Sequence, residues 1–157
     1  MKKETKDIEL GYRIKAISTR KLILNEFSNE RIDEALNNDE LGFKVAVRRD
    51  ISPDKRFVNI DILSEFVFLD DMETIINHVA RTSFEFEGLD NLDSEVSEGI
   101  VGMTMPDDAF IQIHSLAYTH ARALLYSKLS DSYLSDKIIL PVIDSATFLN
   151  IFKEIEE

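Results

Sequence analysis

The sequence contains no cysteine, and this absence excludes several kinds of site. Disulfide bonds, thiolate nucleophiles and cysteine-bound zinc all need the missing thiol, and a reducing cytosol is the simplest setting for such a chain. Long apolar runs are also missing. The charged first residues, 1–7, are not followed by the apolar stretch of a secretory signal, and no run approaches the roughly 18 residues of a membrane span. We therefore expect a soluble, cytoplasmic protein without membrane insertion.

Basic residues are scarce relative to acidic ones: 18 Lys and Arg stand against 30 Asp and Glu, for a net charge of −12. Nucleic acids are bound mainly by Lys and Arg that neutralise phosphates, so no nucleic acid partner is expected. The segment from Glu85 to Glu98 carries six acids and no base. It is either a solvated loop and strand end that keeps the protein soluble, or a surface that attracts basic, unfolded chains.

Histidine is rare too, with only His78, His114 and His120. Two metal ligands on one helix need a spacing of three or four residues, whereas His114 and His120 are six apart and fall on different faces. His120 lies within an apolar helical pattern, which favours a packed core or interface histidine over a ligand. We expect no metal site.

Other catalytic patterns are also missing. The stretch Gly99-Ile100-Val101-Gly102 is not followed by the lysine of a phosphate loop, and no hydroxyl lies in a nucleophile elbow. Asp61 and Glu65 share a strand face, where carboxylates are usually solvated. We predict a protein that is not an enzyme and uses no cofactor.

The hydrophobic share of 44% in 157 residues is sufficient for one domain with a real core. Alternating apolar residues predict four strands, over 12–27, 43–48, 58–68 and 75–87, and residues 52–55 have the composition of a turn. The polar stretch 29–40 is interpreted as a connection with room for a helical turn. We expect residues 1–157 to form a single domain, with 1–10 and 153–157 as flexible ends.

From Pro106 the apolar period changes from two to about three and a half, which predicts a helix capped by Asp107 or Asp108. Residues 130–136 break this helix, and 138–142 form a short extended piece. Asp144 or Ser145 can cap a last helix. Its apolar positions are Phe148, Leu149, Phe152 and Ile155. Strands first and helices last indicate an α+β domain, with helices on one face of an antiparallel sheet.

Apolar residues exceed what one small sheet needs. Phe43, Val45 and Val47 face one way on the second strand. Leu63, Val67 and Leu69 fall on the nominally exposed face of the third. Either a subunit interface or a bound ligand is expected to cover such a surface.

Taken together, the sequence resembles the SecB family of export chaperones. The stretch 12–20 (YRIKAISTR) resembles the first strand of that family, and 84–89 (FEFEGL) resembles its fourth strand and the glycine that follows. His120-Ala121-Arg122, then Leu140-Pro141-Val142, are similar in order and spacing to the family's long helix and linker. The likeness runs from about residue 10 to residue 152.

This resemblance implies a four-stranded antiparallel sheet with a long and a short helix packed on one face. It also implies a homo-oligomer, a dimer of dimers, in which the long helices meet; the corresponding interface positions are Ile113, Leu116, His120 and Leu124. Unfolded client proteins would bind without ATP, as extended segments in an apolar groove that corresponds to Phe43, Val45 and Val47.

One departure concerns the export motor SecA. In export-type members of the family, acidic residues on the sheet contact this motor. Lys21, Asn25 and Asn77 stand where those acids are expected, and the chain ends soon after its last helix. Delivery to SecA is therefore not implied. Three functions stay open: a holdase for unfolded proteins as in SecB-type export, a chaperone of an antitoxin in a toxin–antitoxin system, and a non-chaperone oligomeric binding protein on the same fold.

Overall fold

The computed structural model describes residues 11–87, 94–97, 100–103, 107–144, 146–147 and 150. The elements, in chain order, are β1 (Gly11–Leu24), α1 (Asn29–Asn37), β2 (Leu41–Ile51), β3 (Phe57–Phe68), β4 (Thr74–Glu87), β5 (Ser94–Ser97), β6 (Ile100–Met103) and α2 (Asp107–Leu129). Within these ranges no helix combines the length and the apolar character needed to cross a membrane.

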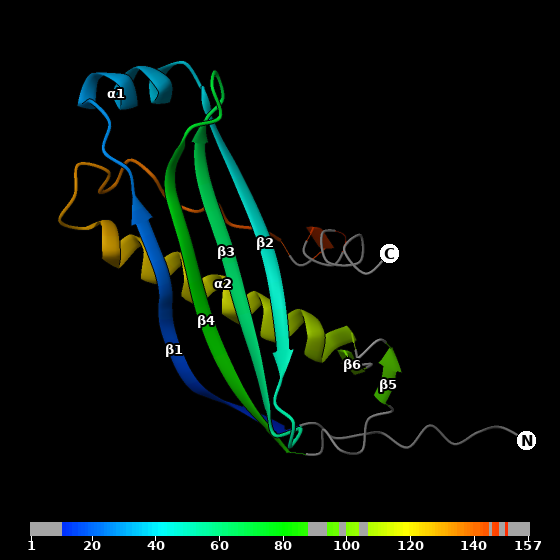
Figure 1. Ribbon diagram of the computed structural model, residues 1–157. Helices are drawn as coiled ribbons and strands as arrows, with labels where there is room; N and C mark the ends of the chain where they lie inside the picture. The colour runs from blue at the N-terminus through cyan, green and yellow to red at the C-terminus, as the bar shows by residue number, and fades with distance from the viewer. Residues whose placement is uncertain are drawn as a thin grey trace, which may run out of the picture.

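Four long strands form one antiparallel sheet in the order β1-β4-β3-β2, so that β1 and β2 are its edges. The hairpin turn between β2 and β3 follows the predicted composition, because Lys55 N donates to Ser52 O at 2.8 Å. In Figure 1 the strands lie in front, and α2 crosses behind them with the chain that follows it. The predicted fold class, a four-stranded antiparallel sheet with a long helix on one face, is confirmed.

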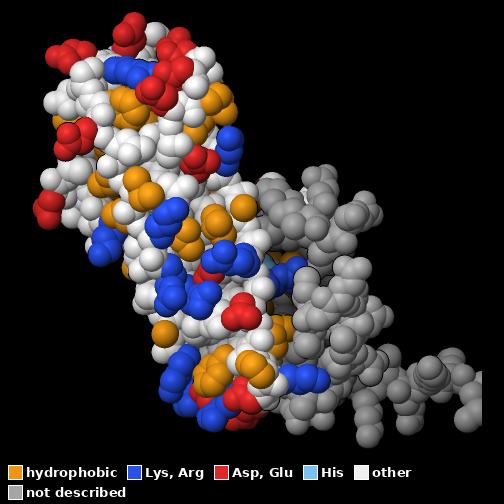
Figure 2. Space-filling view, in the orientation of Figure 1, with side chains coloured by type: hydrophobic (Ala, Val, Ile, Leu, Met, Phe, Trp, Pro, Cys, Tyr) orange, Lys and Arg blue, Asp and Glu red, His pale blue; other side chains and the backbone are white. Residues whose placement is uncertain are grey.

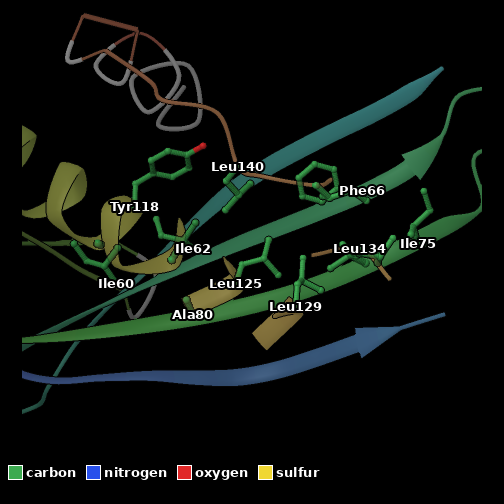
Figure 3. Packing of buried hydrophobic residues seen from close by; sticks show 14 of the residues in the cluster. Ile60, Ile62, Phe66, Ile75, Ala80, Tyr118, Leu125, Leu129, Leu134 and Leu140 are labelled. Carbon is green, nitrogen blue, oxygen red and sulfur yellow. The ribbon is translucent and has the colours of Figure 1, made fainter. Parts of the chain in front are cut away.

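The core lies between the sheet and α2, and strand alternation decides which residues enter it. On β3 every second residue from Val58 to Phe68 faces α2, and each large apolar one among them is buried. Facing them, α2 buries Ile113, Ala117, Tyr118, Ala121, Leu125 and Leu129. Figure 3 shows Tyr118, Leu125 and Leu129 among the residues of this core. Burial of each large aliphatic side chain contributes about 1.5–3 kcal/mol, so this interface is the main source of stability.

A single helix is too narrow for this sheet. An α-helix is about 10 Å across, whereas four strands spaced about 4.8 Å apart span nearly twice that width. Accordingly α2 lies mainly over β4, with less contact to β3 and β1. The faces of both edge strands are therefore left to other parts of the chain or to partners.

Residues 138–143 cover part of the remaining face. Ile138 and Leu140 are buried, and Leu140 lies between Tyr118 and Phe66 in Figure 3. Two hydrogen bonds attach the segment to α2: Tyr118 Oη donates to Pro141 O at 2.6 Å, and Arg122 Nε donates to Leu140 O at 2.9 Å. This short segment therefore acts as a second covering layer beside α2.

Residues 29–37 form a complete helix, α1, where the sequence was interpreted as a connection with room for a helical turn. Ser28 caps it by accepting a hydrogen bond from Arg31 N at 3.3 Å, and Ile32 and Ala35 are buried. The i, i+3, i+4 spacing of Ile32, Ala35 and Leu36 is a helical pattern that the polar composition concealed. The strand before it ends at Leu24 instead of residue 27.

Two further segments differ from expectation or lie outside the described residues. The acidic stretch after β4 contains a hairpin, β5–β6, in which Ser94 pairs with Met103. At the start of the last helix, Asp144 Oδ1 accepts a hydrogen bond from Thr147 N at 2.8 Å, as a cap does. The expected apolar positions of that helix (148, 149, 152 and 155) and the expected flexible ends (1–10 and 153–157) lie outside the described residues.

Candidate functional site

Phe43, Val45 and Val47 form a row on the edge strand β2, called here the β2 apolar strip. They face the side of the sheet that carries α2, opposite Phe66, Ser64 and Ile62 of β3. Phe43 is 40% exposed and its ring centroid lies 5.8 Å from that of Phe66, whereas the two valines are half-buried. The strip is thus continuous with the core but incompletely covered.

More apolar surface lies on the segment that follows α2. Val142 is 77% exposed and Ile139 is about half exposed, although their neighbours Ile138 and Leu140 are buried. In Figure 1 this segment crosses the sheet toward β2. The sequence interpretation did not assign these two residues to the client-binding surface, although the run 138–143 has no charge that would explain its exposure.

The other edge strand, β1, carries a matching row that the sequence interpretation also missed. Ile14, Ile17 and Leu24 face the α2 side, opposite residues of β4, and each is about 40% exposed. Both edge strands therefore expose apolar residues on the α2 side of the sheet. They are exposed because α2 is too narrow to cover the edges.

The four predicted interface residues of α2 do not share one free surface. Ile113 is 1% exposed and packs in the core of its own chain. His120 is half-buried, and its Nδ1 lies 3.0 Å from Thr82 Oγ1 of β4. Leu116 and Leu124 are also half-buried. Of the four, Ile113 leaves almost nothing for a second subunit to cover.

After Asp108 at its start, the outward side of α2 carries little charge. Its residues there include Gln112, Ser115, Leu116, Thr119 and Ala123. Part of this side borders a hollow of about 360 Å³, lined by Asp108, Ile111, Gln112, Ser115, Leu116 and Thr119. Small uncharged side chains permit close approach of another helix.

The apolar residues predicted to need a cover on the outer face of the sheet are partly covered by the chain itself. Val67 is buried and Leu63 is half-buried, while Leu69 is half exposed. Gly42 permits this arrangement, because a Cβ at that position would lie 2.6 Å from Leu69 Cδ2 and 3.2 Å from Val67 Cγ2. The expectation that a partner must cover Val67 is therefore wrong.

Two of the histidines, His78 and His114, are buried, and His120 is half-buried. His78 is fully buried between β4 and α2, its Nε2 lies 3.1 Å from Thr19 Oγ1, and burial lowers its pKa to about 4. Burial also lowers the pKa of His120. His78 Nδ1 and Ser64 Oγ on the neighbouring strand have no hydrogen-bond partner. The described residues include no group of His, Asp and Glu that could hold a metal ion.

Two carboxylates on the outer face of the sheet are buried beneath arginines. Asp61 is 1% exposed and accepts hydrogen bonds from Arg81 Nε at 2.6 Å and Arg48 Nη2 at 2.7 Å. Burial raises the pKa of Asp61, but the hydrogen bonds and charges of the two arginines outweigh it and lower the pKa overall. The expectation that Asp61 is solvated is wrong, because opposite charges on β2 and β4 come into register with it.

Glu85 is held in the same way. It lies between Arg13, which donates to Oε2, and Arg56, whose Nε donates to Oε1 at 2.8 Å. The hydrogen bond from Arg13 is the main reason that the pKa of Glu85 is lowered. Each cluster thus pairs one buried carboxylate with two arginines.

No family model matches the chain, and no curated protein is similar to it in sequence. Among solved structures it is similar to the SecB-like chaperone Rv1957 of Mycobacterium tuberculosis, in complex with a ChAD peptide from the Rv1956 HigA1 antitoxin. The identity is 11% and the TM-score 0.50, over 85% of this chain and 88% of that one. A protein of unknown function from Streptococcus agalactiae has 14% identity and a TM-score of 0.41, over 87% and 98% of the two chains.

The likeness to the mycobacterial protein concerns the fold, because 11% identity conveys nothing about individual side chains. The resemblance that the sequence indicated is therefore confirmed at the level of the fold: the chain has a SecB-like chaperone fold.

Proposed function

We propose that this protein is an ATP-independent chaperone that holds unfolded polypeptides in an extended state. The observation that carries the proposal is the β2 apolar strip. Phe43 is 40% exposed on an edge strand, with Val45 and Val47 half-buried beside it. An apolar row on a strand edge suits an extended chain, whose alternate side chains can contact the row while its backbone lies along the edge.

The energetics favour binding of many sequences. Burial of roughly 1,000 Å² of apolar surface contributes about 25 kcal/mol before costs, and ordering an unfolded client offsets most of it. Burial is non-directional, so affinity follows from apolar area rather than from a particular sequence. Such a surface selects unfolded segments, because folded proteins rarely expose long apolar stretches of chain.

A second, narrower function is the chaperone of a single antitoxin. It is favoured by the mycobacterial structure, whose SecB-like chaperone holds a peptide from an antitoxin. The resemblance to the SecB family gives it further support, because it implies that Lys21, Asn25 and Asn77 stand where export-type members have acids that contact SecA. We therefore propose that delivery to SecA is weak or absent.

We further propose that the protein acts as a homo-oligomer, a dimer of dimers. Support comes from the outward side of α2, which carries no charged residue from Gln112 to Thr119, and from the exposed apolar row on the edge strand β1. A single subunit can contact a client through its β2 apolar strip. An oligomer would present several such strips to one long client chain.

The test is suppression of aggregation of a refolding client, at stoichiometric amounts and without nucleotide, by the parent protein and by Phe43→Asp. We expect the parent to suppress aggregation and the variant to lose most of this activity. Ile23→Asp is the matched control, because Ile23 is exposed to a similar degree (42%) but lies on the opposite face of the sheet.

Circular dichroism and thermal melting establish that each variant is folded. Absence of suppression by the folded parent protein would overturn the chaperone proposal. Equal loss in Phe43→Asp and Ile23→Asp would leave the chaperone function standing but remove the β2 apolar strip as its site.

A further inference from the structure

The charges of this acidic chain are unevenly distributed. The sheet strands with the turn between β2 and β3, residues 11–24, 41–68 and 74–87, contain ten of the 18 basic residues but only six of the 30 acidic ones. Their net charge is +4, against −12 for the whole chain. Acidic residues gather elsewhere, for example around α1 and the turn between β3 and β4.

Most of these basic residues point away from α2. Strand register places on the outer face a set that we call the basic face: Arg13, Lys21, Lys44, Arg48, Arg56 and Arg81. Figure 2 views the sheet from this side, where Lys and Arg side chains gather over its middle and lower parts and acidic side chains gather at its upper end. The field of the basic face is therefore opposite in sign to that of the whole molecule.

The buried carboxylates make this face more positive instead of neutralising it. Asp61 is shared by Arg48 and Arg81, and Glu85 by Arg13 and Arg56, so each cluster keeps one excess positive charge. Arg48 remains 63% exposed. A guanidinium has five N–H donors and the bonds to Asp61 use two of those on Arg48, so donors remain for a partner.

The other carboxylates of the face are less prominent. Asp50 and Glu87 lie near the ends of their strands. Glu65 lies opposite Lys44 on the neighbouring strand, is half-buried, and accepts a hydrogen bond from Thr74 Oγ1 at 2.6 Å. The middle of the face therefore presents guanidinium and ammonium groups to solvent.

Between the charged rows runs an apolar one. Register places Lys21, Val79, Leu63 and Ala46 side by side across the four strands. The adjacent row contains Arg81, Asp61 and Arg48. An incoming chain with both acidic and apolar side chains can pair with the arginines and lysines while it buries Leu63 and Ala46.

We propose that the basic face is a docking surface for an acidic, partly apolar polypeptide segment. Carboxylates match the planar fork of arginine in two parallel hydrogen bonds. A nucleic acid fits less well, because the apolar row has no aromatic platform for bases and the net charge of −12 repels a long polyanion. The proposal concerns the face opposite the β2 apolar strip and does not depend on the chaperone function.

The test uses a synthetic peptide of alternating Glu and Leu with Gly spacers, titrated into the full chain by calorimetry, with a Lys and Leu peptide of the same length as control. Lys21→Glu and Lys44→Glu reverse charges on the basic face without touching Asp61 or Glu85. Lys128→Glu makes the same charge change on α2, away from this face. We expect each of the first two variants to weaken binding about fivefold and the third to leave it unchanged.

Heteronuclear NMR shifts of Arg48 and Arg81 side chains are expected to locate the peptide on this face, with affinity that falls as salt increases. The proposal is overturned if the acidic peptide does not bind, if the basic peptide binds equally well, or if all three variants weaken binding alike. It is also overturned if single-stranded RNA binds more tightly with the same dependence on Lys21 and Lys44, since the partner would then be a nucleic acid.

Discussion

Arg81 Nε donates to Asp61 Oδ1 at 2.6 Å, across β4 and β3, and joins a carboxylate that is almost fully buried to a side chain that is mostly buried as well. Arg48 completes the pair from β2, so one carboxylate connects three of the four sheet strands. A buried carboxylate that loses a partner keeps its desolvation cost, which makes this cluster sensitive to substitution.

We expect Arg81→Met to lower the free energy of unfolding by about 2 kcal/mol, because Asp61 would retain only the exposed Arg48 as its counter-charge. Arg48→Met is the matched comparison. We expect this variant to lower the free energy of unfolding by less than about 1 kcal/mol, since a solvated guanidinium contributes less to stability than a buried one. Urea denaturation of both variants checks the order, and a larger loss in Arg48→Met would contradict it.

The buried His78 predicts a dependence of stability on pH. Its pKa is lowered to about 4 in the fold, against an ordinary value of 6.5. Between these values the unfolded chain binds a proton that the folded chain does not, so stability decreases as pH falls from about 6.5 to about 4 and this contribution is constant below. The loss is of the order of 3 kcal/mol.

His78→Gln removes this titration while keeping a polar group near Thr19. We expect the difference in unfolding free energy between about pH 7 and about pH 5 to be smaller in this variant than in the parent protein. Denaturant titrations at both pH values measure it. An unchanged difference would show that His78 is not the group responsible.

The cap of α1 predicts a smaller effect. Ser28→Ala removes the oxygen that accepts from Arg31 N, and we expect a loss of about 1 kcal/mol in the free energy of unfolding. Ser28→Asp, which restores an acceptor at the same position, is expected to recover most of it. Chemical denaturation followed by circular dichroism measures both variants, and equal stability of the alanine variant and the parent would contradict the role of the cap.

Much of the sheet was predictable because apolar residues recur at every second position of β3. Val58, Ile60, Ile62, Phe66 and Phe68 face α2 and are buried, and a register error of one residue would turn them to the other face. The opposite face mixes Asp61 and Glu65 with Leu63 and Val67, so the polar half of the pattern is less regular. The long helix α2 was predictable for the same reason, at a period near 3.6. In contrast, α1 was predicted only as a connection with room for a helical turn, since its nine residues carry only three apolar ones among charged and amide side chains.

The candidate site was only partly predictable. Phe43, Val45 and Val47 stand out in the sequence, but their exposure depends on how much of the sheet α2 covers, which follows from widths in three dimensions. The burial of Asp61 could not be predicted, because Arg48 and Arg81 lie 13 and 20 residues away and reach it only through the register of β2 and β4. Charges on separate strands become a cluster only after pairing.

Self-association and client capture are expected to depend on different residues. Leu116→Asp places a charge in the middle of the outward side of α2, and we expect it to lower the molar mass measured by light scattering. Phe43→Asp is expected to leave the molar mass unchanged while it weakens client capture. The separation follows from geometry, because Leu116 is on the outward side of α2 and Phe43 is on the edge strand beside Phe66. If Phe43→Asp dissociated the assembly and Leu116→Asp did not, the β2 apolar strip would be the subunit interface, and clients would have to bind elsewhere.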